Sequence, residues 1–384
     1  MLGAGIFVAL APAAAAAGSA LLLGLAVAAV VAYCNATSSA RLAALYPRSG
    51  GTYVYGRERL GPFWGYTAGW SFVVGKTASC AAMALAVGSY AWPTHAHAVA
   101  VAAVVALTAV NTVGVQKSAW LTRLIVAVVL GVLAAVVVAI IGSGDADVSR
   151  LAWHDASLLG VLQAAGLSFF AFAGYARIAT LAEEVRDPST TIPRAIRIAL
   201  GLVLVIYAVV AVAVLAQLGS AAMASATAPL ADAVAAAGRP WLTPVVRVGA
   251  TVAALGSLLA LILGVSRTVL AMARDRHLPG LLAAVQPRFD TPYRAELAVG
   301  AIVAVLAAVL DLRGAIGFSS FAVLVYYAIA NASALTLGAR LIPTVGLIGC
   351  VVLAFTLPVT SVAVGVAVVL FGAAVYAVRR RFAR

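Results

Sequence analysis

Charged residues are scarce in this chain. Asp, Glu, Lys and Arg make up 10% of the 384 residues, whereas soluble domains contain roughly 25%. Hydrophobic residues make up 64%, the mean hydropathy is +1.10, and a soluble fold cannot hide that much apolar surface. Apolar runs such as 125–141 and 200–215 are long enough, or nearly so, to cross about 30 Å of hydrocarbon as helices. We therefore predict an all-α polytopic membrane protein.

Residues that usually build metal or catalytic centres are also few. Cys34, Cys80 and Cys350 each lie in an apolar segment. Because their number is odd and their spacing matches no metal motif, we interpret them as small buried hydrophobes. The four histidines fall at predicted helix ends or in loops. No predicted span carries a His/Asp/Glu cluster or a paired nucleophile and base, so we expect no metal, no cofactor and no enzymatic activity.

Positive charge exceeds negative charge, with a formal net charge of +13. Most basic residues fall in short loops on one predicted side of the membrane. The basic residues of the opposite side are Arg150, Arg239 and Arg313. This asymmetry indicates membrane orientation rather than binding of nucleic acid. The positive-inside rule predicts a multi-pass protein of the plasma (inner) membrane, with both termini in the cytoplasm.

Hydropathy and loop signals divide the chain into about twelve apolar segments. They are 1–16, 19–46, 63–92, 97–113, 118–142, 157–182, 196–218, 243–271, 294–311, 316–339, 342–357 and 359–378. The first contains Pro12, is too short for a full span and has no basic region typical of a signal peptide. We interpret it as the second half of a helix whose first half is missing. A short re-entrant segment is the alternative.

Two segments contain sequences that weaken a membrane helix. In the first segment, Gly3 and Gly5 lie one residue apart and Pro12 follows. A half-helix that begins there would direct free N–H groups and its positive end into a cavity, which suits a carboxylate. Close helix packing is the other interpretation, and the spacing alone favours it.

The sixth segment has three phenylalanines and a tyrosine around a small-residue step that ends at Gly174. Unwinding there would expose carbonyl groups that can accept from an ammonium group, with aromatic rings over the ligand. An aromatic packing face is the alternative. Because the two interrupted segments hold matching positions in two halves of five helices, they point to a transporter site at a repeat interface.

The motifs in these regions are similar to those of one known family. They are GAGIF (3–7), YPRSGGTYVY (46–55), LGPFWGYTAGW (60–70), FFAFAGY (169–175), EEVRDP (183–188), IPRA (192–195) and SR (266–267) with AMARDRHLP (271–279). In this order and spacing, the chain resembles permeases of the amino acid–polyamine–organocation (APC) superfamily over nearly its whole length. The resemblance implies a LeuT-like fold of two inverted five-helix repeats, expected at 1–142 and 157–339. It also implies two additional helices at 342–378, followed by a basic tail at 379–384.

The resemblance further implies how an amino acid is held during alternating access. Backbone N–H groups of the first-helix motif hold the substrate carboxylate; here these are Gly3, Ala4 and Gly5. Backbone carbonyls of the sixth-helix break hold the amine, here Phe170 and Ala173. The side chains that line or gate the pocket are Phe169, Phe172 and Tyr175.

Lys76 lies in the middle of the third segment, where an ionisable residue is costly and indicates function by default. We expect Lys76 either to contact substrate or exchange a proton, or to donate structurally to a broken-helix carbonyl. Some members of the superfamily have a proton-coupling lysine in the fifth helix, but Val129 occupies that place here. Arg177 is a second coupling or gating candidate, and a helix-terminal structural charge is its alternative role.

No Asp or Glu lies deep in any predicted span, and Ala176 stands where the family often has an acidic residue. A cavity without a carboxylate is a poor host for a basic side chain. We therefore predict a permease for neutral amino acids, driven by proton symport or substrate exchange, in contact with the lipid bilayer. The alternatives are a truncated, transport-inactive membrane protein or partner subunit, and an exchanger of cationic amino acids or polyamines. The oligomeric state stays open.

Overall fold

The computed structural model describes residues 3–47, 50–113, 119–153, 156–172, 174, 187–289 and 291–382. These residues form helices and connecting turns, with one isolated β-bridge between Gln286 and Thr291. Within this part of the chain, eight helical stretches are long and apolar enough to cross a membrane. The predicted all-α polytopic membrane protein is thereby confirmed.

The long helices follow the predicted apolar segments closely. They are α2 (Leu21–Leu45), α4 (Pro62–Ala91), α5 (Ala96–Thr112), α6 (Ala119–Ile141), α9 (Pro188–Ser225), α11 (Thr243–Arg274), α12 (Tyr293–Val309), α13 (Leu312–Leu335), α14 (Leu341–Thr356) and α15 (Val359–Phe382). Two shorter apolar helices are α1 (Gly5–Ala17) and α7 (Leu158–Phe172). Two more short helices, α3 (Thr52–Leu60) and α10 (Pro229–Ala236), lie where the sequence predicted loops.

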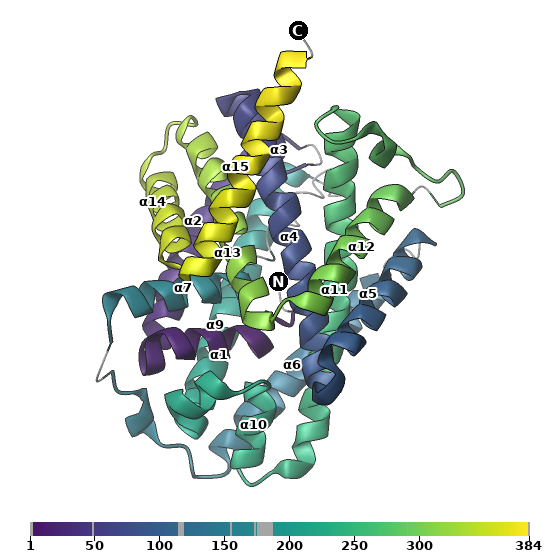
Figure 1. Ribbon diagram of the computed structural model, residues 1–384. Helices are drawn as coiled ribbons and strands as arrows, with labels where there is room; N and C mark the ends of the chain where they lie inside the picture. The colour runs from purple at the N-terminus through teal and green to yellow at the C-terminus, as the bar shows by residue number, and fades with distance from the viewer. Residues whose placement is uncertain are drawn as a thin grey trace.

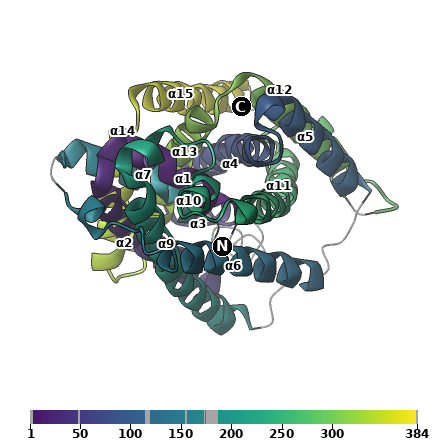
Figure 2. The same ribbon diagram turned by 90° about the horizontal axis from the view of Figure 1, so that it is seen from below.

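Helix α4 forms the centre of the bundle and packs against α11 and α13, whereas α15 and α5 lie on the outside (Figures 1 and 2). Small residues allow this close approach. A Cβ at Gly75 would lie 2.8 Å from the Ala322 Cβ of α13, and one at Gly69 would lie 2.9 Å from the Met272 Sδ of α11. A Cβ at Gly65 would lie 2.7 Å from the Arg57 Cβ of α3. Thus Gly65 and Gly69 make their close contacts within the chain.

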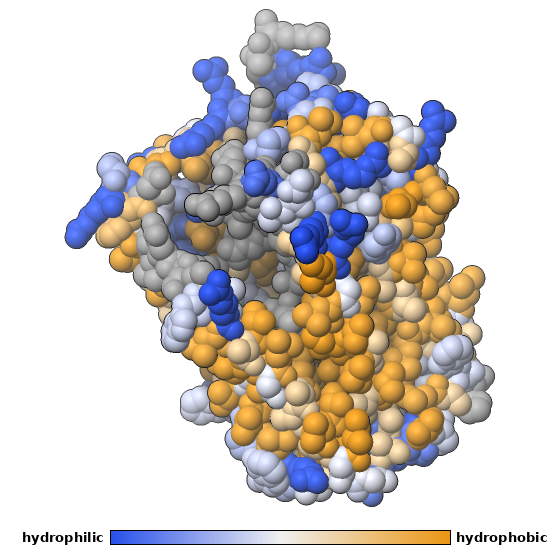
Figure 3. Space-filling model, turned by 180° about the vertical axis from the view of Figure 1, so that it is seen from behind, coloured by the Kyte–Doolittle hydropathy of each residue, from blue (hydrophilic) through white to orange (hydrophobic). Residues whose placement is uncertain are grey.

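The outer surface is largely apolar, as a lipid-facing protein requires. Figure 3 shows hydrophobic residues spread over the middle of one face, with hydrophilic residues mainly toward the upper and lower ends. Large exposed side chains on α5, α6, α9 and α15 include Val105, Val138, Val205 and Leu370. Their exposure to water would be unfavourable, and hydrocarbon removes that cost.

A polar cluster joins α3 to the residues that follow α11. The Tyr53 hydroxyl donates to Asp275 Oδ2 at 2.5 Å and lies 2.8 Å from His277 Nδ1. Arg57 donates to the same carboxylate oxygen at 2.8 Å. Because the single Tyr53 proton goes to Asp275, His277 must be the tautomer that donates from Nδ1 to the phenol oxygen. Burial lowers the pKa of the His277 imidazole.

A second polar cluster is buried among α2, α13 and α14. Asn331 donates to Asn35 Oδ1 at 2.6 Å and to the Tyr327 carbonyl at 3.0 Å, and it accepts from Ser38 at 2.7 Å. Asn331, Asn35 and Ser38 are each 0% exposed. The amide of Asn331 therefore connects two neighbouring helices by bonds that have no competition from water.

Candidate functional site

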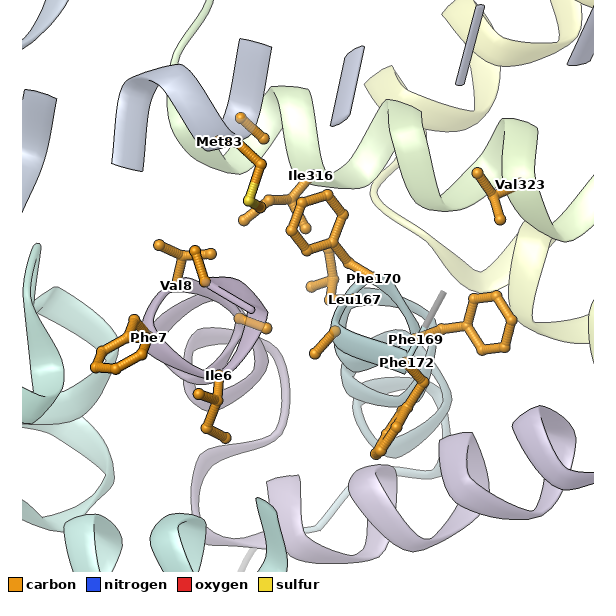
Figure 4. Close-up of a cluster of buried hydrophobic side chains, with 14 of the residues drawn as sticks. Ile6, Phe7, Val8, Met83, Leu167, Phe169, Phe170, Phe172, Ile316 and Val323 are labelled. Carbon is orange, nitrogen blue, oxygen red and sulfur yellow. The ribbon is translucent and has the colours of Figure 1, made fainter. Parts of the chain in front are cut away.

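Helices α1 and α7 are the two short helices of the bundle interior and pack against each other (Figures 1 and 4). They contain 13 and 15 residues. Helix α1 begins at Gly5, and its N-cap residue Ala4 offers no side-chain cap. Helix α7 ends at Phe172. The Phe7 N–H donates to the Ala4 carbonyl at 3.0 Å. The N–H groups of Gly5 and Ile6 precede the first helical hydrogen bond, so that end can accept an anionic ligand.

A cavity of about 470 Å³ lies where these two helix ends meet. This volume falls in the range of roughly 300–1,000 Å³ that small-molecule sites occupy. Its lining from α1 and the residues just before it is Gly3, Ala4 and Gly5, and its lining from the α7 end is Phe170, Ala171 and Gly174. The remaining wall comes from α4, α6 and α11. The two interrupted segments named by the sequence thus border one cavity.

The glycines of the first motif allow the helix ends to touch. A Cβ at Gly5 would lie 2.7 Å from the Ala171 Cα of α7. A Cβ at Gly3 would lie 2.6 Å from the Ser257 Oγ of α11. The structure thus shows the close packing that the sequence offered as one interpretation, and a carboxylate site at this helix start stays a prediction.

The aromatic residues of the sixth segment separate into two groups. Phe170 lines the cavity and points toward Met83 and Ile316 (Figure 4). Phe169 packs edge-on against Tyr327 at 5.8 Å between ring centroids, and Phe172 packs against Tyr207 at 5.3 Å. Both are buried away from the cavity lining. The other two predicted residues of this region, Ala173 and Tyr175, lie outside the described residues, as does Arg177.

Lys76 of α4 lies in the cavity wall together with Phe72 and Ser79. Its side chain is 6% exposed. Among the lining residues that the structure describes, Lys76 carries the only formal charge. The cavity therefore combines the free N–H end of α1 with one buried cationic side chain, and this favours ligands with an anionic group.

Helix α11 supplies a cavity wall that was not predicted from the sequence. Small residues recur there every three or four positions, at Ala253, Ser257, Ala260 and Gly264, and all four line the cavity. This spacing puts them on one helix face. The small-residue stripe was visible in the sequence, but a stripe alone does not distinguish a cavity wall from a packing face.

Glu296, in the first turn of α12, was not predicted from the sequence either. It lies near the end of a predicted span, and its side chain is 0% exposed. The cavity lining does not include it.

Comparison with known proteins gives one consistent family. The family model described as amino acid permease matches residues 1–380. An uncharacterized transporter of Mycobacterium tuberculosis is 74% identical over 100% of this chain and 89% of its own length. A branched-chain amino acid permease of Bacillus subtilis is 26% identical over 81% of this chain and 72% of its own length. Human cationic amino acid transporter 4 is 29% identical over 84% of this chain and 54% of its own length. The chain therefore belongs to the amino acid permease family, in agreement with the predicted resemblance to the APC superfamily.

Proposed function

We propose that this permease is a secondary active transporter of neutral amino acids that works by alternating access. The cavity between the start of α1 and the end of α7 is the observation that carries the proposal. A zwitterionic amino acid places its carboxylate at the N–H groups around Gly3, Ala4 and Gly5. Its ammonium group faces the carbonyls at the α7 end, where Phe170 covers it. No covalent chemistry is involved.

The arrangement supports the division of the chain into two inverted repeats, 1–142 and 157–339, followed by α14 and α15. In this scheme α1 and α7 are the first helices of the two repeats. Both are short, and both have one end at the cavity. Transporters with inverted repeats bind substrate at such interrupted helices. The scheme further assigns the protein to the plasma membrane, with both termini in the cytoplasm.

The charge of Lys76 supports neutral over cationic substrates. Two positive charges about 8 Å apart, across a cavity of this size, repel each other by about 2 kcal/mol at an effective dielectric constant of roughly 20. The described lining contains no acidic residue that offsets this repulsion. The named relatives include both a branched-chain permease and a cationic transporter, so the lining is the basis for the choice. Proton symport or substrate exchange supplies the driving force, and Lys76 is the coupling candidate inside the cavity.

Uptake by proteoliposomes tests the proposal. Purified protein is reconstituted, and a panel of labelled neutral, cationic and acidic amino acids and polyamines is offered with and without a pH gradient. We expect saturable uptake of neutral amino acids. Preferred uptake of arginine or a polyamine would instead assign a cationic exchanger. If none of these compounds is taken up, the result would support the alternative of a transport-inactive membrane protein.

A pair of variants tests the role of Lys76. Lys76→Ala removes the cavity charge, and Arg340→Ala removes an exposed charge at the start of α14. We expect Lys76→Ala alone to change substrate selection or the response to the gradient. Wild-type behaviour of both variants would refute a coupling role for Lys76.

A further inference from the structure

Glu296 of α12 is a fully buried carboxyl group outside the substrate cavity. Its side chain is 0% exposed, and neither carboxyl oxygen has a hydrogen-bond partner within the described part of the chain. Buried polar groups in native proteins are almost always satisfied, so such a group requires an explanation. In hydrocarbon the requirement is stricter, because no water is at hand.

The surroundings of Glu296 contain a second unsatisfied group. Helix α12 packs against α5, and Gly300, one turn beyond Glu296, faces Thr108 of α5: a Cβ at Gly300 would lie 2.5 Å from Thr108 Oγ1. The Thr108 hydroxyl is buried and has no partner among the described residues. The α5–α12 interface thus contains a carboxyl and a hydroxyl with unused hydrogen-bonding capacity.

Among the described residues, few charges act on Glu296. Helix α12 also packs against α4, α11 and the turn Gly280–Ala283, which has no titratable side chain. Arg267 of α11 is the cation whose charge acts on the Glu296 carboxyl. Lys76 of α4 lines the cavity instead, and His97 of α5 contacts the Ala307 carbonyl, about three turns farther along α12.

The energetic balance favours a bound proton at Glu296. Burying an ionised carboxylate costs several kcal/mol, even after the surroundings relax. The dipole of α12 stabilises a carboxylate in its first turn by only about 0.3–1 kcal/mol. A neutral carboxyl with unmet hydrogen bonds costs less, about 1–3 kcal/mol. Arg267 favours the carboxylate, but its side chain is exposed and solvent weakens its attraction, so the protonated form stays the favoured one in this conformation.

Helix α11 connects Glu296 to the cavity. Its residues Gly264 and Val265 line the cavity, and Arg267, two positions farther on, is exposed. A movement of α11 relative to α12 would change the distance from Arg267 to Glu296 and the access of water to the carboxyl. We propose that Glu296 is a proton-binding site that is separate from the substrate cavity and is loaded and emptied once in each transport cycle. This inference rests on the proposed transport function.

The test compares two transport modes in proteoliposomes. Glu296→Gln keeps the shape of the protonated side chain and cannot release a proton. Glu58→Gln, which neutralises a partly exposed carboxylate on α3, is the matched control. With one proton per substrate, a pH difference of one unit limits accumulation to about tenfold. We expect Glu296→Gln to lose this accumulation and keep exchange of internal for external substrate, and Glu58→Gln to keep both.

The outcomes separate the inference from the proposed function. Accumulation by Glu296→Gln equal to that of wild type would overturn the proton site, and so would wild-type uptake that ignores the gradient; amino acid transport itself would stand in both cases. Absence of both uptake and exchange in wild type would overturn the transport function. Infrared spectra of wild type with carbon-13 at its glutamate carboxyls require no substitution. A missing band from a protonated glutamate at neutral pH would also refute the site.

Discussion

Gly5→Ala changes the contact on which the candidate site depends. The added Cβ would lie 2.7 Å from the Ala171 Cα and 2.9 Å from the Ala171 Cβ, whereas ordinary contacts of a Cβ are 3.4–4 Å. The start of α1 and the end of α7 must therefore move apart by about 1 Å, since non-bonded carbons settle about 3.5–4.0 Å apart. The obstruction is helix backbone and a methyl group, so no rotamer change relieves it.

The cost to stability is modest, and the cost to binding is larger. Overpacking costs about 1–3 kcal/mol, and replacing glycine by alanine in a helix returns up to about 1 kcal/mol, so the net change is about 0–3 kcal/mol of destabilisation. A hydrogen bond to a charged group contributes about 1.5–3 kcal/mol. If separation of the helices weakens one N–H bond to the substrate carboxylate, affinity falls roughly tenfold to a hundredfold.

Equilibrium binding of labelled substrate to the purified protein in detergent measures the affinity, and thermal unfolding of the same samples measures stability. The control is Gly131→Ala in α6, where an added Cβ meets nothing within 4 Å. We expect the control to bind normally and to unfold at an equal or higher temperature. Wild-type affinity in Gly5→Ala would refute the reasoning that the close approach of α1 to α7 forms the carboxylate site.

Three further predictions follow from the buried clusters. Asn331→Ala removes the partner of Ser38 and leaves its hydroxyl buried, so unfolding in detergent should show a loss of about 1–3 kcal/mol. The lowered pKa of His277 means that the unfolded chain binds its proton more readily, so stability should fall as the pH decreases below about 6.5. His277→Gln should flatten that decline in thermal unfolding measured across this range. Phe170→Ala should change the order of substrate preference in competition assays, whereas Phe172→Ala should lower stability by about 3–5 kcal/mol and leave that order unchanged.

The end of α7 could be anticipated from the sequence because its cause is local. An aromatic–glycine step marks a place where a membrane helix can end, and α7 spans Leu158–Phe172. That Gly3 and Gly5 interrupt a membrane helix stays a prediction. By contrast, α3 and α10 contain 9 and 8 residues. They are held by contacts with distant helices, and a short helix has no strong periodic signal of its own.

The orientation of the aromatic side chains could not be predicted, because it depends on the rotation of a helix against its neighbours. Phe169 and Phe170 are adjacent and therefore lie about 100° apart around α7. Both are candidates from the sequence, but the sequence does not indicate which face of α7 borders the cavity. The contacts of Phe169 with Tyr327 and of Phe172 with Tyr207 leave Phe170 on the cavity side. The same uncertainty hid the α11 wall, whose small residues are suited equally to packing and to a cavity.

A polar residue in a membrane span has either a structural or a functional role, and hydrogen bonding helps to distinguish the two. Asn331 is 0% exposed, but both of its amide hydrogens and its oxygen have partners, so its burial is explained by helix contact. Glu296 is equally buried, and both of its oxygens lack partners among the described residues. A carboxyl that makes no hydrogen bond and has one exposed cation near it gains little from its burial. Its presence is explained by a state of the cycle in which water and Arg267 come closer to it. Among the described buried residues with unmet hydrogen bonds, Glu296 is the one with a carboxyl group, and hydropathy alone does not identify it.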